Sequence, residues 1–295
     1  MPREGRNAAG AAGLSATGLA AAIGVAGLGS FLAARESDPA RSLSFGALGI
    51  SAALACAACA LAALGREPVA ARLGLGPARL GAGTTGLLAL GLVALSQALE
   101  SAISLAGWRA HSVLPLFDEA VAAARGADRV LVLVALGLVP GVAEELFCRG
   151  WMQRGLTRRL PPAVAIGLAA AVFGVLHGDP VHAGAAFALG LYLGWVAWIG
   201  DSVRPAMVCH VANNAVAVGW VGLRGAPDAG AEPDRVALVA LVAGCTAVSL
   251  LAVRRALRGI PSGRGARPEA GAGSAPTPPE GAPAALQTAP RPAEE

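Results

Sequence analysis

The chain has 295 residues, of which 55% are hydrophobic and only 14% are charged, and its mean hydropathy is +0.59. Soluble domains carry about a quarter charged residues, so this composition excludes an ordinary soluble protein and indicates a polytopic membrane protein. The net charge of +4 comes from arginine without any lysine, and no basic cluster is interleaved with aromatic residues. The charge fits arginine-rich cytoplasmic loops and argues against nucleic-acid binding.

Apolar runs of about 20 residues, the length that spans a bilayer, recur along the chain. The first run is longer than the roughly 7–15-residue core of a signal peptide, so we expect it to be a retained membrane helix. The predicted fold class is all-α, a polytopic membrane helix bundle of about eight transmembrane helices. The expected spans are residues 8–34, 43–65, 80–99, 130–152, 162–178, 181–199, 203–223 and 236–253.

The spans suggest three regions. Residues 1–79 are expected to form an N-terminal transmembrane hairpin region of two spans, and residues 80–253 the core of the protein. Within that core, the mixed polar segment 100–129 is expected to fold as an interfacial helix or a cap over the bundle. The Pro-, Ala- and Gly-rich residues 254–295 cannot bury a core, so a disordered cytoplasmic tail is expected there.

The arginines also predict an orientation, because cytoplasmic loops collect positive charge. Eight spans place both termini on one side, and that side gathers most of the arginines, so both termini are predicted to be cytoplasmic. The arginine-rich, alanine-rich composition suggests a GC-rich genome and hence a bacterial cell membrane. The arginines on the predicted cytoplasmic side are Arg3, Arg6, Arg66, Arg72, Arg79, Arg154, Arg158, Arg159, Arg204, Arg254, Arg255 and Arg258.

Two adjacent acids, Glu144 and Glu145, lie in the middle of an apolar span. An ionisable residue there costs about 2.5–3.5 kcal/mol on insertion scales, so a polar site inside the bundle is expected. Glu145 and Arg149 are one helical turn apart and share a face, which favours an ion pair. Glu144 points about 100° away and stays free of that pair. A purely structural ion pair would explain Glu145 and Arg149 but not Glu144.

Two further polar pairs occur within apolar spans. Phe173 and His177 are four residues apart and share a helix face, as do His210 and Asn214. Taken alone, His177 fits a residue at a helix end, and the second pair fits a hydrogen bond between helices, worth about 0.6 kcal/mol on average. His177 lies 16 residues beyond Pro161, or about 24 Å along a straight helix. Either that helix is tilted, or it begins outside the membrane, or the predicted topology is wrong.

Together the three pairs supply a carboxylate, two imidazoles, an amide and a guanidinium on three helices. This set fits acyl-transfer chemistry at a carbonyl. A desolvated carboxylate can remove a proton from water, and imidazole and amide N–H groups can stabilise the resulting oxyanion.

The segments EELFCR, FGVLH and HVANN resemble the motifs EExxxR, FxxxH and HxxxN/D of the CPBP family, the CAAX prenyl protease and bacteriocin-processing (Rce1-like or Abi) intramembrane endopeptidases. The three motifs occur in the family order within residues 80–250. The resemblance implies that Glu144 is the general base that activates water, assisted by His177, and that His210 and Asn214 form the oxyanion hole. Glu145, Arg149 and Phe173 would support the site.

No cofactor is expected, because the residues argue against zinc. HExxH is absent, and a catalytic zinc site needs three protein ligands and a water. Glu144, His177 and His210 would be the ligands of a zinc-dependent alternative, which stays open at this point.

The expected function is hydrolysis of a peptide bond in a membrane-associated or lipidated protein or peptide, with the lipid bilayer as the other partner. A proton-coupled transporter is an alternative, because buried Glu and His also form proton relays. Paired halves with broken helices would favour it, and only Pro140-Gly141 suggests such a break. A non-catalytic membrane scaffold is the third possibility. The identity of the substrate, its prenylation and the oligomeric state are left open by the sequence.

Overall fold

The computed structural model describes the backbone of residues 2–226 and 234–259, and the side chains of residues 17–226 and 234–258. Within these ranges every regular element is helical and no strand is formed. Seven of the described helices are long and apolar enough to cross a membrane by length and composition. The eighth expected span, α9 (Pro162–Val175), is apolar but has only 14 residues. The predicted all-α polytopic bundle is confirmed.

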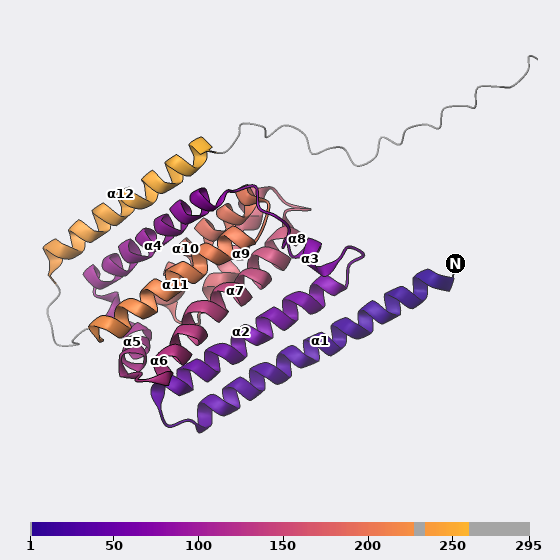
Figure 1. Cartoon of the computed structure of the whole chain (residues 1–295), viewed down its shortest axis with the longest axis horizontal. Helices are drawn as coiled ribbons and strands as arrows, with labels where there is room; N and C mark the ends of the chain where they lie inside the picture. The colour runs from indigo at the N-terminus through magenta and orange to yellow at the C-terminus, as the bar shows by residue number, and fades with distance from the viewer. Residues whose placement is uncertain (1, 227–233, 260–295) are drawn as a thin grey trace, which may run out of the picture. The chain divides into compact units, whose positions relative to one another are not determined.

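The chain begins with two long helices, α1 (Pro2–Arg35) and α2 (Pro39–Ala63), which lie side by side (Figure 1). The tight turn between them is fixed by Asp38, whose carboxylate accepts a hydrogen bond from the backbone N–H of Arg41 at 3.0 Å. This side chain caps the N-terminus of α2. Helix α2 also packs along the part of the chain that carries the two glutamates.

A short helix, α3 (Val69–Arg72), connects α2 to α4 (Ala82–Leu105), which continues beyond the expected end of its span at residue 99. The mixed polar segment then folds as a 3-10 helix, η1 (Trp108–His111), and a ten-residue α-helix, α5 (Leu114–Ala123). We call η1 and α5 together the cap segment. It is held by Arg109, which makes ion pairs with Glu100 of α4 and with Asp118 of α5.

The two glutamates lie on one continuous helix, Ala127–Leu156, which we call the central helix. It changes between α- and π-helical geometry along its length, so two wider turns flank the short α-helical stretch that carries the glutamates. The Pro140-Gly141 pair does not interrupt it. Its parts are α6 (Ala127–Val132), η2 (Leu133–Leu138, π), α7 (Val139–Glu145), η3 (Leu146–Gln153, π) and α8 (Arg154–Leu156).

Three long helices follow α9: α10 (Pro180–Gly200), α11 (Arg204–Arg224) and α12 (Arg235–Gly259). The last lies along α4 (Figure 1) and continues past the expected boundary at residue 253. The remainder of the expected tail, residues 260–295, lies outside the described residues.

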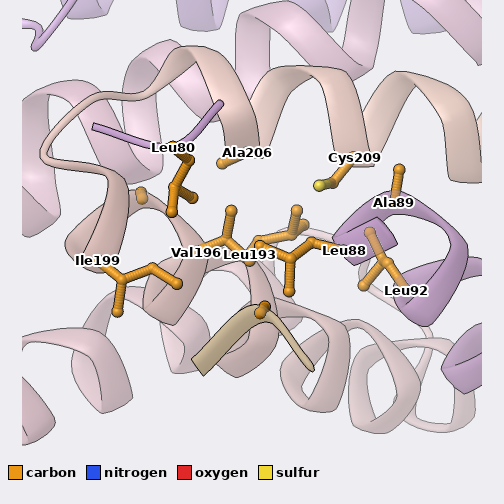
Figure 2. Packing of buried hydrophobic residues seen from close by; sticks show 11 residues of the cluster. Leu80, Leu88, Ala89, Leu92, Leu193, Val196, Ile199, Ala206 and Cys209 are labelled. Atoms are coloured by element: carbon orange, nitrogen blue, oxygen red, sulfur yellow. The ribbon is translucent and has the colours of Figure 1, made fainter. Parts of the chain in front are cut away.

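Helices α4, α10 and α11 meet in the largest apolar cluster, which Figure 2 shows at close range. Cys209 of α11 is completely buried in it, so its neighbour His210, about 100° further round the helix, faces the central helix instead. The cluster thereby fixes the rotation of α11. Its fully buried members include Leu88, Leu92, Leu193, Val196, Ala206 and Cys209.

The central helix and α11 approach each other closely at Gly141. A Cβ atom there would lie 2.9 Å from the backbone nitrogen of Val211. Small residues allow such close contacts between membrane helices. This contact sets the spacing between α7, with Glu144, and α11, with His210.

Large apolar side chains remain exposed on the outer faces of these helices. A soluble protein rarely exposes contiguous apolar surface on this scale, whereas lipid-facing helices require it. On α11 the exposed apolar residues are Val208, Val216, Trp220 and Leu223. The lengths of the helices and these surfaces are those of an integral membrane protein.

Candidate active site

Glu145 and Arg149 form the predicted ion pair, and both side chains are completely buried. Arg149 Nη1 lies 2.6 Å from Glu145 Oε1. Arg149 Nη2 donates to the Gly190 carbonyl of α10 at 2.9 Å, and the guanidinium lies 4.5 Å from the centre of the Phe173 ring. A buried charge pair needs such additional partners to offset its desolvation. The pair therefore joins the central helix to both α9 and α10.

His210 extends this pair across to α11. Its Nδ1 lies 2.9 Å from Glu145 Oε1, while its Nε2 lies 3.9 Å from Glu144 Oε2. An ionised carboxylate only accepts hydrogen bonds, so Nδ1 carries the proton shared with Glu145. In the neutral ring Nε2 is then unprotonated and faces Glu144. In the imidazolium form both nitrogens donate.

Glu144 differs from its neighbour in having no hydrogen bond to any of the residues that the structure describes. Its side chain retains 18% of its accessible surface, whereas that of Glu145 retains none. The nearest polar partner of Glu144 is His210, and no hydrogen bond or ion pair joins it to His177. The expected direct contact between Glu144 and His177 is therefore not formed. The expectation that Glu144 stays outside the Glu145–Arg149 pair is confirmed.

His177 lies just beyond the end of α9, whereas it was expected near the end of the span 162–178. Its Nδ1 lies 2.8 Å from the Phe173 carbonyl oxygen. Because a carbonyl accepts, Nδ1 is the protonated nitrogen of the neutral ring and Nε2 is an available acceptor. The 14 residues of α9 rise only about 21 Å. His177 follows this full rise, and its depth relative to Glu144 in the membrane stays a prediction.

The Phe173 ring brings the three motifs together. Its centre lies 4.9 Å from the His177 ring and 5.6 Å from the His210 ring, edge to face in both cases. Arg149 lies over the same ring at 4.5 Å. Phe173 is buried, so it fixes two imidazoles and a guanidinium around one rigid surface.

Asn214 contacts the central helix about two turns before the glutamates. Pro140 has no N–H and cannot donate to the Leu136 carbonyl four residues earlier. Asn214 Nδ2 donates to that carbonyl at 3.4 Å, and Asn214 Oδ1 accepts from the Asn213 amide at 3.3 Å. An amide carries two N–H donors, so one stays available after the contact with Leu136.

Three polar residues around the site were not among the predicted site residues. Gln153 is buried two turns after Glu145 and donates to the Gly194 carbonyl at 2.8 Å. Its spacing of one helical turn from Arg149 could have indicated that it lies on the same face of the helix. The His182 ring lies 4.5 Å from the His177 ring. Asp179 caps α10 and accepts a hydrogen bond from the Ser112 hydroxyl at 2.8 Å. That contact ties the cap segment to the turn that carries His177, and no local sequence pattern predicts it.

The zinc alternative needs Glu144, His177 and His210 to converge. Among the residues that the structure describes, no three His, Cys, Asp or Glu side chains are placed to hold a metal ion together. Glu144, His177 and His210 therefore do not form a three-ligand zinc site in this arrangement.

Residues 126–216 match the family model described as type II CAAX prenyl endopeptidase Rce1-like. The matched segment contains all three motifs. Residues 126–216 thus form an Rce1-like region. The match begins beside the first residue of the central helix and ends within α11, so it covers the helices that meet around Phe173.

No curated protein and no solved structure matches the chain. The Rce1-like match supports a CAAX-type intramembrane endopeptidase in general, and with it a peptide substrate at the lipid bilayer. It does not assign roles to single residues.

Proposed function

We propose that this protein is a metal-free intramembrane endopeptidase that hydrolyses a peptide bond of a membrane-associated or lipidated protein or peptide. The observation that carries the proposal is the difference between the two glutamates. Glu145 is paired with both Arg149 and His210, while the partly exposed Glu144 has no hydrogen bond among the described residues. A carboxylate with free lone pairs beside an imidazole is suited to general-base catalysis.

In the proposed reaction Glu144 removes a proton from a water molecule as the water oxygen bonds to the scissile carbonyl carbon. The imidazolium form of His210 and the remaining N–H of Asn214 donate to the oxyanion that forms. Collapse of this intermediate breaks the C–N bond, and the proton held by Glu144 passes to the leaving amine. His177, whose Nε2 is free of the hydrogen bond to Phe173, assists in orienting the water. Each preorganised donor to the oxyanion contributes about 10²–10³ in rate.

The site also requires its polar groups to be shielded from lipid. Glu145, Arg149 and His210 are buried between the central helix, α9, α10 and α11. Burial strengthens each charge–dipole contact because the local dielectric is low.

We infer that both termini are cytoplasmic and that the membrane is a bacterial cell membrane, on the basis of the arginine distribution and the composition.

The substrate is tested by comparing cells that carry the wild-type protein with cells that carry Glu144→Gln, an isosteric change that removes only the base. We expect protein N-termini created by cleavage at the membrane to disappear in the variant, while the variant protein accumulates normally. Cleavage at the wild-type rate by Glu144→Gln would refute the mechanism. Proton flux into proteoliposomes that depends on Glu144, without any cleavage, would support the transporter alternative. Loss of folding in the variant would support the scaffold.

A further inference from the structure

A pocket lined by four arginines lies at the end of the central helix, away from the glutamates. Its volume is about 330 Å³, and its charged lining consists of Arg72 of α3, Arg154 and Arg158 at and just after α8, and Arg159. The Trp151 side chain forms part of its apolar wall. Trp151 follows Glu144 by seven residues, or about 10 Å along the helix axis. The pocket is therefore separate from the candidate active site.

Acidic residues only partly balance these arginines. Arg158 pairs with Glu67 at 2.8 Å, and Arg154 lies 3.7 Å from Asp201, which Arg79 also contacts at 2.9 Å. Arg72 and Arg159 have no acidic partner within 4 Å among the described residues. Two guanidiniums of the lining are thus left without an ion pair, because Glu67, whose charge also acts on Arg72, is paired with Arg158, and Asp201 is paired with Arg79.

The pocket lies where apolar helices end. Helix α2 ends at Ala63, the central helix at Leu156 and α10 at Gly200, all on the arginine-rich side of the protein. The loops at this end are joined, because Ser202 Oγ donates to the Gly74 carbonyl at 3.1 Å. The ends of membrane helices coincide with the headgroup layer, where Trp and Arg are favoured. An occupant of this pocket therefore sits at the depth of lipid phosphates.

We propose that this pocket binds the phosphate of an anionic phospholipid headgroup, with Arg72 and Arg159 as its main partners. The planar guanidinium matches phosphate oxygens in a two-pronged arrangement, and Trp151 and its apolar neighbours face the start of the acyl chains. Basic pockets between membrane helices on the cytoplasmic side suit such headgroups. The proposal is independent of the peptidase chemistry.

The pocket is connected to the site by aromatic contacts. The Trp151 ring lies 5.5 Å from the Phe147 ring, and Phe147 packs against the buried cluster of Cys148, Phe173 and Ala186. A bound headgroup that fixes Trp151 therefore also restrains η3, the π-helical stretch that carries Arg149. Lipid binding should raise the stability of the helix on which the ion pair is built.

The test uses the full-length protein in nanodiscs of phosphatidylcholine alone or with added phosphatidylglycerol, with lipid binding measured by native mass spectrometry and stability by thermal unfolding. An arginine near an anionic membrane contributes about 1 kcal/mol, or fivefold in affinity, so Arg72→Gln with Arg159→Gln should weaken phosphatidylglycerol binding about 25-fold. The control is Arg254→Gln with Arg255→Gln, which removes the same charge from exposed positions of α12. The control should keep the wild-type preference.

A charge-neutral variant supplies a second test. A Cβ atom on Gly65 would lie 1.3 Å from Arg72 Nη1, so Gly65→Ala must displace this guanidinium. It should lower the preference for phosphatidylglycerol without changing the net charge. An equal loss in the pocket variant and the α12 control would overturn the proposal. The proposal would also be overturned if inorganic phosphate stabilised the protein equally in phosphatidylcholine discs. It would likewise be overturned if a peptide with a free C-terminal carboxylate displaced the lipid and the corresponding amide did not.

Discussion

His210 lies between the two glutamates, with Nδ1 2.9 Å from Glu145 Oε1 and Nε2 3.9 Å from Glu144 Oε2. One imidazole therefore connects the acid that is fixed in the ion pair with the acid that is free. The buried Glu145 determines which nitrogen of His210 is protonated, and this leaves the opposite nitrogen to act next to Glu144. The two adjacent acids thus have different surroundings on either side of the same histidine.

His210→Ala should lower kcat by about 10²–10³, the usual cost of removing an oxyanion donor, with a smaller change in KM. The reason is that the His210 donor acts on charge that develops only in the transition state. Cleavage kinetics with a substrate identified through Glu144→Gln provide the measurement. The control is His111→Ala, an exposed residue of the cap segment, which should be neutral. An unchanged kcat in His210→Ala would remove His210 from the oxyanion hole.

Arg149→Met should destabilise the protein by about 3–5 kcal/mol, because it leaves Glu145 charged and buried without its main partner. Unfolding in detergent micelles measures this cost. Arg79→Met, which removes an exposed partner of Asp201, should cost at most about 1 kcal/mol. Adding Glu145→Gln to Arg149→Met should recover part of the loss. If the two arginine variants are equally stable, the pair at Arg149 does not act as a buried charge pair.

Gly141→Ala should destabilise the protein by about 1–3 kcal/mol, the cost of overpacking, and should also reduce cleavage. The added methyl group lies 2.9 Å from the Val211 backbone nitrogen and forces α7 away from α11, which separates Glu144 from His210. Gly167→Ala on α9 is the matched control, since its Cβ would meet no atom within 4 Å. Equal behaviour of the two variants would show that the close approach is not needed.

Asp179→Ala should loosen the cap segment, because Asp179 accepts hydrogen bonds from the Ser112 hydroxyl and the Val113 N–H as well as from the His182 N–H. Hydrogen exchange in η1 and α5 should become faster in this variant. Glu119→Ala, an exposed change within α5 itself, serves as the control and should leave exchange unchanged. Protection that is the same in wild type and Asp179→Ala would contradict this role.

The same contact predicts a pH dependence. The His182 backbone N–H, followed by the Ser112 hydroxyl and the Val113 N–H, holds the pKa of Asp179 below its usual range. A folded-state pKa below the unfolded value of about 3.9 means that the stabilisation is complete above that pH. It is lost as the pH falls through the lower folded-state value. Protection of the cap segment should therefore be constant at neutral pH and decrease only in strong acid.

Chelation tests the metal-free proposal. Because the three candidate ligands do not converge among the described residues, we expect cleavage to persist after treatment with 1,10-phenanthroline or EDTA. Loss of cleavage that zinc restores would establish the zinc-dependent alternative instead. A soluble zinc endopeptidase treated in parallel shows that the chelator is active.

Much of the fold and part of the site could be predicted from the sequence, because both depend on local patterns. Helices are set by apolar runs whose length the bilayer dictates, and the Glu145–Arg149 pair follows from a spacing of one turn. The resemblance placed His210 in one site with Glu144, but the contact of His210 with Glu145 could not be predicted, because it depends on the rotation of α11 set by Cys209 and on the close approach at Gly141. The contact of Asp179 with Ser112 joins residues that are 67 positions apart.

The π-helical turns of the central helix have a consequence for where its side chains point. A π turn accommodates an extra residue within the ladder of backbone hydrogen bonds, and such turns are frequent at functional sites. Each extra residue rotates the downstream part of the helix by about 100° relative to an uninterrupted α-helix. Because η2 precedes α7 and η3 follows it, the side chains of α7 point in directions that are rotated relative to those of the helix on either side. The two ends of the helix can keep their apolar sides toward lipid while the seven residues between them turn their acids inward.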